Sequence, residues 1–337
     1  MRPFLIFFVS LTLLLTSCSG KERARHHSGI AMGTFCDLTF YPPENSKASE
    51  ISSSVFRRMG YLESLWSIHR KESEIYRLNQ TGQVRSSPET RRLLTRSVEI
   101  SEITGGAFDI TVAPLMAAWR EAQKTGKMPE VKKLLSLVDY RKIKIASDGT
   151  VSFLKSGMAV DLGGVGKGAA VDEAAALLKS YGVKSGMVNL GGNIYAFGDG
   201  PRNGKWRIGI QNPKKDGIVN SIIIKDCGVS TSGNYQRYFE IAGKRYSHIL
   251  NPKTGTLENF PDSVTVMAPD AALADGLSTA FEVLGPEKGM AIAEKIPGVE
   301  VLFIMSDGRR IHTKNFPYLT REGNFSRPEI NEPDFPK

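Results

Sequence analysis

The sequence predicts a mixed α/β (α+β) fold: a single compact domain in which mixed sheets are flanked by helices. Segments in which apolar residues alternate, as in strands, interleave with segments in which they recur at helical spacing. We find no internal repeat and no clear linker in the 337 residues. That length suffices for one large core or for two closely packed lobes.

The start of the chain predicts an export signal rather than part of the fold. Arg2 precedes an apolar run that is too short to span a bilayer as a stable helix. The sequence LTSC, which ends at Cys18, matches the pattern at which bacterial lipoprotein signals are cut. We therefore expect residues 1–17 to be removed and Cys18 to carry acyl chains that hold the protein on a membrane. The alternative is an ordinary secretory signal with an incidental cysteine.

The remaining chain divides into three expected parts. The polar composition of residues 18–29 predicts a tether whose two histidines are solvated. We expect residues 30–318 to form one domain. Residues 319–337 are polar and contain prolines, which is typical of a disordered tail. With a lipid on Cys18, we expect the domain at the periplasmic face of a bacterial membrane, with the inner membrane favoured over the outer.

The formal charge of +9 does not require a nucleic-acid partner. An exported lipoprotein meets little nucleic acid, so anionic lipid or an anionic cofactor fits the charge better. Because the basic residues are scattered, a merely solvated surface is the favoured explanation. Besides Cys18, the chain has Cys36 and Cys227. They could form one disulfide in an oxidising compartment or remain two buried thiols.

The first half of the domain contains one expected strand and two expected helices. Residues 35–40 alternate like a strand, and residues 49–66 repeat apolar positions at helical spacing. A second helix is expected over 88–103, because Ser87 can cap its first turn and a glycine pair follows its end.

The middle of the chain contains short elements. We expect short helices over 114–123 and 129–137. Residues 142–153 alternate on both sides of an Asp-Gly turn, which predicts a hairpin. The glycine pair in VNLGGNIYAFG lies in a strand context and indicates a bulge or a close backbone contact, with no obvious reactive group.

A glycine-rich turn from strand to helix offers a candidate anion site. In MAVDLGGVGKGAAVDEAAALL, an apolar strand leads into Asp161, four glycines follow, and a helix begins. Backbone amides at a helix start cradle anions, and Lys167 adds a positive charge. The segment is neither a Walker motif nor a G-x-G-x-x-G motif. Such a turn can be purely structural, but beside Asp161 and Lys167 it favours a diphosphate.

A second glycine site, ITGGAFDITVAPL, places Phe108 and Asp109 directly after a tight turn. The aromatic ring could lie against a planar ligand, and the carboxylate could bond a sugar hydroxyl or a ring nitrogen. Composition alone favours the simpler interpretation, which is a helix stop followed by a core phenylalanine.

The segment 270–284 predicts a helix with Asp275 and Thr279 one turn apart on one face, opposite an apolar stripe. Either this face is simply solvated, or it lines a cleft where its oxygens suit Mg²⁺. His248, in Ser-His-Ile-Leu-Asn-Pro before a turn, is a candidate for either a structural or a catalytic role.

Seven motifs in this order resemble the ApbE family of FAD:protein FMN transferases. They are MGT, GGAFDITVAPL, DLGGVGKG, NLGGNIYAFG, TSGNY, SHILNPKTG and ADGLSTA, and the resemblance as a whole extends from about Ile30 to Ile304. The resemblance implies a single ApbE-like domain in a periplasmic lipoprotein. It also implies that the protein binds FAD and Mg²⁺, transfers FMN to a Thr or Ser hydroxyl of a partner protein, and releases AMP.

The resemblance also assigns residues. The metal would be held by Asp275, Thr279 and a main-chain oxygen near Gly164. Asn251 stands where the family often has Asp, so a role that needs this carboxylate is not implied. The residues that would contact FAD are Met32, Tyr76, Ala107, Phe108, Asp109, Asp161, Lys167 and Ile249.

The acceptor is expected to be a separate flavoprotein, because this chain has no Asp-x-x-Ser/Thr-Gly-Ala-Thr motif. Members of the family usually serve respiratory ion-pumping complexes. A base should help the weakly nucleophilic hydroxyl, and we expect His248 to be that base and Asp275 to be mainly a metal ligand. The alternatives are a Mg²⁺-dependent FAD pyrophosphatase that yields FMN and AMP, and a flavin-binding lipoprotein without turnover.

Overall fold

The computed structural model describes residues 23–317, apart from 202–203, 234–237, 242 and 258–260. The predicted signal, Cys18 and the predicted tail lie outside the described residues. Within the described ranges, none of the helices combines the length and the apolar character needed to cross a bilayer.

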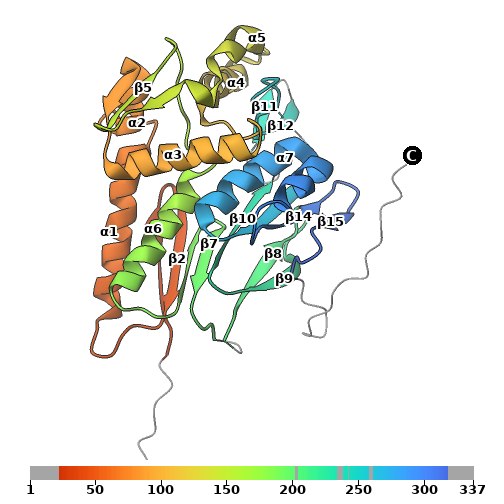
Figure 1. Cartoon of the computed structure of the whole chain (residues 1–337). Coiled ribbons are helices and arrows are strands. Elements are labelled where there is room, and N and C mark those ends of the chain that lie inside the picture. The colour runs from red at the N-terminus through yellow and green to blue at the C-terminus, as the bar shows by residue number, and fades with distance from the viewer. Residues whose placement is uncertain (1–22, 202–203, 234–237, 242, 258–260, 318–337) are drawn as a thin grey trace, which may run out of the picture.

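An eight-stranded sheet forms the centre of the fold (Figure 1). The mixed α/β class is confirmed, but the expectation of mixed sheets is wrong, because every pairing between the described strands is antiparallel. Short turns that reverse the chain join some neighbouring strands directly, and longer segments that contain helices or further hairpins connect the other antiparallel neighbours. In spatial order the strands are β1 (Arg25–Ala31), β2 (Thr34–Phe40), β6 (Gly186–Leu190), β7 (Asn193–Phe197), β10 (Cys227–Gly233), β13 (Ser263–Ala268), β14 (Glu300–Ile304) and β15 (Arg310–His312).

Three smaller sheets surround the centre. The predicted hairpin is confirmed as β4 (Ile143–Ile145) and β5 (Thr150–Phe153), which β3 (Gln83–Arg85) extends. Two further hairpins are β8 (Trp206–Gln211) with β9 (Ile218–Ile224), and β11 (Tyr238–Ile241) with β12 (Lys244–Ser247). Buried side chains of β8 and β9 share an apolar cluster with side chains of β7, β10 and β14, so this hairpin covers the outer face of the central sheet there.

The predicted helices are confirmed and others join them. Ser87 caps α3 as predicted, because its hydroxyl accepts a hydrogen bond from the Thr90 amide at 3.3 Å. The expected helix 129–137 is α5 followed by a short 3₁₀ turn. The helices are α1 (Ala48–Trp66), α2 (Glu74–Thr81), α3 (Pro88–Ile103), α4 (Ala113–Thr125), α5 (Val131–Leu134), α6 (Gly166–Ser180) and α7 (Ala271–Ala293), with 3₁₀ turns at Ile110–Val112, Leu135–Leu137 and Tyr140–Lys142.

Helices α6 and α7 lie together on the inner face of the central sheet, with α3 across them (Figure 1). Helix α7 is therefore buried on nearly all sides, and it kinks at Gly285 before Pro286. The carboxylate of Asp172 in α6 accepts hydrogen bonds from the Ala271 and Ala272 amides at 2.8 and 2.9 Å. This contact caps α7 and fixes its start against α6.

The expected tether boundary requires a correction. Residues from Arg25 onward, assigned to a polar tether that ends at residue 29, belong to β1 and pair with the whole of β2. His26 bonds to the Thr39 hydroxyl at 2.8 Å, and the His27 ring stacks on Phe40. Because β1 is an edge strand, most of its side chains are polar, and its sequence therefore lacks the alternation of apolar and polar residues that predicts a strand.

Cys36 and Cys227, the cysteines within the described ranges, are free thiols, so a disulfide between them is excluded. Cys36 lies in β2 and Cys227 in β10, with β6 and β7 between them. At roughly 4.8 Å between neighbouring strands, that separation is too long for an S–S bond. Burial raises the pKa of the Cys36 thiol to about 12 and that of Cys227 to about 11.

Candidate active site

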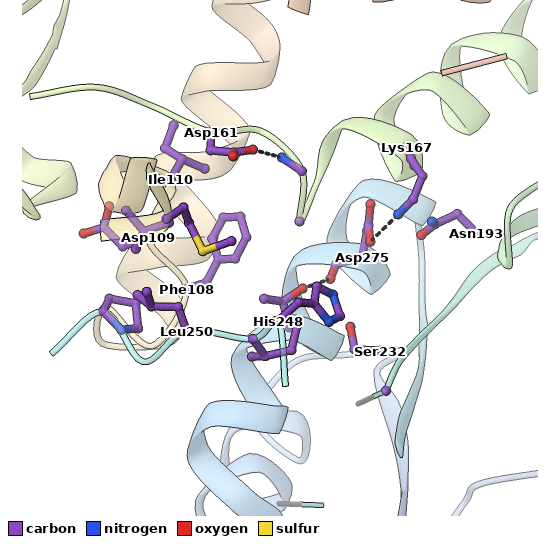
Figure 2. Close-up of a pocket in the computed structure, with 18 of the residues that line it drawn as sticks. Phe108, Asp109, Ile110, Asp161, Lys167, Asn193, Ser232, His248, Leu250 and Asp275 are labelled. Atoms are coloured by element: carbon purple, nitrogen blue, oxygen red, sulfur yellow. Dashed lines mark hydrogen bonds and ion pairs between the residues drawn. The ribbon is translucent and has the colours of Figure 1, made fainter. Parts of the chain in front are cut away.

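A cavity of about 380 Å³ lies where the start of α7, the glycine turn before α6 and the loop after α3 meet (Figure 2). This volume is within the usual range of ligand pockets. In Figure 2 the labelled polar groups Lys167, Asn193 and Asp275 lie on one side, and Phe108 and Leu250 lie on the other.

Asp275 is buried in the wall of this cavity, with only 4% of the residue exposed. Its Oδ2 accepts a hydrogen bond from the Gly168 amide at 3.0 Å, and Ser230 Oγ lies 3.4 Å from Oδ1. The Thr279 hydroxyl, one turn later on α7, donates to the Asp275 carbonyl at 3.2 Å and lines the same cavity. The solvated-face alternative is therefore excluded, and the face of α7 that carries Asp275 and Thr279 lines a cleft.

Lys167 and Asn193 complete the polar wall around Asp275. Lys167 Nζ is 4.0 Å from Asp275 Oδ1. Turned so that its nitrogen faces acceptors, the Asn193 amide donates to Ser230 Oγ at 2.8 Å and to Asp275 Oδ1 at 3.0 Å, and its oxygen accepts from Lys167 Nζ at 3.0 Å. Asn193 thus bridges the carboxylate and the ammonium group.

The glycine turn contributes backbone instead of side chains. A Cβ on Gly164 would lie 3.2 Å from both Thr279 Oγ1 and a ring carbon of Phe108, so a larger residue would fill this part of the cavity. Asp161 shapes the turn, because its Oδ1 accepts from the Gly163 amide at 2.9 Å and its Oδ2 pairs with Arg120 at 3.1 Å. The backbone can therefore approach a bound ligand closely.

The opposite wall is more apolar. Phe108 is 4% exposed and Ala107 is 3% exposed, and both line the cavity after the positive-φ turn at Gly105-Gly106. The interpretation of Phe108 as merely a core residue is therefore incomplete, because the ring also borders the cavity. Its neighbours in this wall are Ile110, Val112, Met116, Leu250 and Pro252.

Asp109 lies in the cavity wall, but its carboxylate already has protein partners. Oδ1 accepts from the Thr111 amide at 2.8 Å and from the Thr111 hydroxyl at 2.6 Å, and Oδ2 accepts from the Tyr140 amide at 3.0 Å. Burial raises the pKa of this carboxyl above its ordinary value. The geometry thus gives Asp109 a structural role at two 3₁₀ turns, and its contact with FAD stays a prediction.

His248 and Ile249 reach the cavity from the segment after β12. His248 is half-buried, Ile249 is 6% exposed, and both line the cavity with Thr231 and Ser232 of β10. Ser232 Oγ is 2.8 Å from Ser278 Oγ of α7, and Ser278 donates to the Asp275 carbonyl at 2.9 Å. The His248 imidazole therefore shares the cavity with the Asp275 carboxylate and with the hydroxyl groups of Thr231 and Ser232.

The structure brings together all but two of the site residues expected from the sequence. Met32, at φ +49° in the β1–β2 turn, and Tyr76, in α2, do not line this cavity, so their FAD contacts stay predictions. The other expected residues line it, and their roles toward FAD and the metal stay predictions: Ala107, Phe108, Asp109, Asp161, Gly164, Lys167, His248, Ile249, Asp275 and Thr279.

Sequence reasoning missed several polar groups at the site, and Asn193 is the main one. The glycine pair before it is a hairpin turn, with Gly191 at φ +57° and Gly192 at φ +90°, instead of the expected bulge. Two such glycines between strands predict a two-residue turn, which places the next residue at the start of a strand. That signal could have identified Asn193. Thr34 ends the MGT motif, but no role was assigned to it, and Ser230 lies outside all seven motifs.

Comparisons with known proteins agree with the motifs. The sequence profile of the ApbE family matches residues 32–303. A FAD:protein FMN transferase of Treponema pallidum (strain Nichols) is 33% identical over 327 residues, which cover 87% of this chain and 88% of that protein. One of Vibrio cholerae serotype O1 is 32% identical, with 95% of this chain and 100% of that protein covered.

Solved structures show the same fold. The crystal structure of the ApbE protein from Thermotoga maritima has a TM-score of 0.79 at 28% identity, and the match covers 87% of this chain and 97% of that one. The flavin transferase ApbE from Vibrio cholerae has a TM-score of 0.76 at 29% identity, with 86% and 96% covered.

Proposed function

The chain belongs to the ApbE family, and we propose that it transfers FMN from FAD to a Thr or Ser hydroxyl of a separate acceptor protein, releasing AMP, in a Mg²⁺-dependent reaction. The observation that carries this proposal is the buried Asp275, which faces a cavity together with Lys167 and the glycine turn. A respiratory flavoprotein of the ion-pumping type is the acceptor that we favour.

The two walls of the cavity match the two chemical parts of FAD. The Phe108 ring and its apolar neighbours suit one of the planar ring systems. The Lys167 ammonium suits the diphosphate, and the start of α6 adds the positive end of the helix dipole. Asn193 accepts a hydrogen bond from Lys167 and thereby orients the ammonium.

The residues present fit a magnesium ion. Asp275 offers a carboxylate, Thr279 a hydroxyl, and Gly164 a main-chain carbonyl, and hard oxygens of this kind suit Mg²⁺. The close approach of Gly164 to Thr279, which a Cβ would obstruct, supports this grouping. When bound, Mg²⁺ would offset negative charge that develops on the diphosphate.

The hydroxyl of the acceptor needs a group that takes its proton. As its oxygen forms a bond to the FMN phosphorus, the bond from phosphorus to the bridging oxygen breaks, and AMP leaves with that oxygen. We propose that His248 takes the proton, since its imidazole lines the same cavity. A positioned base contributes about 10² to 10⁴ in rate. Near-normal transfer by His248→Ala would assign this role to another group.

The experiment that tests the function weighs the acceptor. The protein is incubated with FAD, Mg²⁺ and an acceptor protein that contains an Asp-x-x-Thr-Gly-Ala-Thr segment. We expect the acceptor to gain the mass of one FMN phosphoester and AMP to appear in equal amount. Free FMN without an adduct would identify a pyrophosphatase instead, and unchanged FAD would identify a binding protein.

We also propose that the protein is a lipoprotein anchored through Cys18 at the periplasmic face of a bacterial membrane, the inner membrane being favoured. The LTSC sequence and the preceding apolar run support this proposal. The described fold begins close behind, with β1 at Arg25. The active-site domain would then follow its anchor after only a few residues.

A further inference from the structure

Two large apolar side chains stand exposed at the tip of the β1–β2 hairpin. Ile30 and Phe35 are cross-strand partners, and each is 76% exposed. We call this pair the hairpin patch. The β8–β9 hairpin covers the outer face of the sheet at β7, β10 and β14, and its apolar cluster does not include the patch. Two adjacent exposed apolar side chains form a contiguous apolar surface, which is where contact surfaces are sought.

The hairpin patch adjoins the wall of the cavity through the backbone of β2. Thr34 lines the cavity, and the next residue, Phe35, points to the opposite face of the strand. The amide of Gly191, which also lines it, donates to the Phe35 carbonyl at 2.9 Å. A Cβ on Gly191 would lie 2.6 Å from Thr34 Oγ1, so the two turns are in tight contact. The patch therefore has a fixed position beside the place where transfer would occur.

We propose that the hairpin patch is the docking surface for the acceptor protein, and that it seats an apolar side chain of the acceptor segment close to the Thr or Ser that receives FMN. This inference rests on the proposed function, since that reaction must bring a polypeptide to the cavity. An apolar contact beside the cavity would hold the segment while its hydroxyl enters.

The position of the patch along β1 favours an acceptor over a lipid surface. The chain enters β1 at Arg25, and the patch lies at the opposite end of this seven-residue strand. At roughly 3.3 Å per residue, the strand spans about 20 Å. The patch therefore points away from the end at which the proposed anchor joins the domain.

The test compares the double variant Ile30→Thr/Phe35→Thr with the wild type, using the acceptor protein with the Asp-x-x-Thr-Gly-Ala-Thr segment. Threonine suits strands, and both positions are exposed, so the fold should persist. We expect the KM for the acceptor to rise about tenfold or more, with kcat at saturating acceptor and the affinity for FAD unchanged. Ile218→Thr, at a strand residue that is 60% exposed and does not line the cavity, should change none of these values.

Separate results decide between failure of the function and failure of the docking surface. If the wild type does not modify the acceptor, the proposed function fails. If it does and the double variant has the wild-type KM, the docking surface is refuted. The docking surface is equally refuted if the double variant keeps the wild-type KM but loses binding to anionic lipid vesicles, or loses self-association in sedimentation.

Discussion

At the scale of a single residue, Asp275 is a buried carboxylate that is surrounded by polar groups. Its carboxylate is nearly inaccessible, yet a backbone amide, a serine hydroxyl and the Asn193 amide surround it. Lys167 stands 4.0 Å away, which offsets the negative charge without a close ion pair. A carboxylate held in this way is preorganised for a cation.

Thr279 gives a conservative test of the metal site. Thr279→Ala removes a proposed ligand, so we expect at least a tenfold increase in the Mg²⁺ concentration that gives half-maximal transfer. Thr279→Ser keeps the hydroxyl and should stay within about threefold of the wild type. Mg²⁺ titrations of both variants, together with Mn²⁺ binding measured by electron paramagnetic resonance, check this. Equal behaviour of the two variants would show that the hydroxyl is not a ligand.

Glu282, two turns beyond Asp275 on α7, is a second buried carboxyl with a different character. It is fully buried, and neither carboxylate oxygen has a hydrogen-bond partner in the structure. Burial raises the pKa of this carboxyl from 4.5 to about 8. The protonated form is therefore the one that the folded state tolerates near neutral pH.

This carboxyl should make stability depend on pH. Below pH 4.5 the carboxyl is protonated in both states, so its stabilisation is complete. Between that pH and about 8 only the unfolded state releases the proton, so the free energy of unfolding should fall by roughly 1.4 kcal/mol per pH unit. Glu282→Gln should remove this slope in urea unfolding series, with the exposed Glu287→Gln as the control. Parallel pH profiles of Glu282→Gln and the wild type would contradict the argument.

Most site residues were predictable at this scale, and the missing ones share a reason. His248, Lys167, Asp275 and Thr279 lie within motifs that carry their own chemistry. Asn193 and Thr34 line the cavity, and Ser230 lies beside the Asp275 carboxylate. These three strand residues come together only because sheet pairing brings three separate strands to the site. Such convergence depends on long-range pairing, which local sequence patterns do not encode.

At the scale of elements, the crossing of α6 and α7 fixes the site. A Cβ on Gly168 would lie 2.2 Å from the Ala271 carbonyl oxygen, so only glycine permits this approach. The same approach lets the Gly168 amide reach Asp275. Asp172, one turn later in α6, caps α7. Helix α6 thus sets both the position of α7 and the orientation of its acidic side chain.

Gly168→Ala should test this close crossing. The added methyl group meets backbone, which cannot rotate away, so we expect the free energy of unfolding to fall by about 1–3 kcal/mol. The control is Gly166→Ala in the same helix, where the nearest atom is 3.8 Å from the new Cβ. That change should be neutral or slightly stabilising. Equal urea midpoints for the two variants would show that the helices can separate without cost.

Helices and hairpins were predicted well from the sequence because their signals are local. Ser87, the Gly105-Gly106 stop and the Asp148-Gly149 turn each act within one turn of the chain. Pairing direction and strand order could not be predicted in this way. The antiparallel order and the inclusion of Arg25 in β1 arise from partners far along the chain.

At the scale of the whole molecule, helices and the β8–β9 hairpin cover the two faces of the central sheet. Helices α6 and α7 pack on the inner face, and β8–β9 covers part of the outer face (Figure 1). Strand β1 lies at one edge of the sheet, with the hairpin patch at its far end. Anchor, docking surface and cavity would then follow one another along a single edge.

The anchor gives a prediction at this scale. Cys18→Ser should abolish acylation, so the protein should move from the membrane fraction to the soluble fraction and lose label from radioactive palmitate. Purified soluble domain should keep its transfer activity, since Cys18 lies outside the described fold. Cys36→Ser, at a buried thiol, is the control for labelling. Continued membrane association and labelling of Cys18→Ser would refute a lipid at this position.

A structure determined with FAD and Mn²⁺ bound tests the central claim most directly. The claim predicts an anomalous peak that is coordinated by the Asp275 carboxylate, the Thr279 hydroxyl and a carbonyl near Gly164, with the diphosphate of FAD beside Lys167. A nucleotide bound elsewhere, with the cavity under α7 holding neither metal nor phosphate, would contradict it.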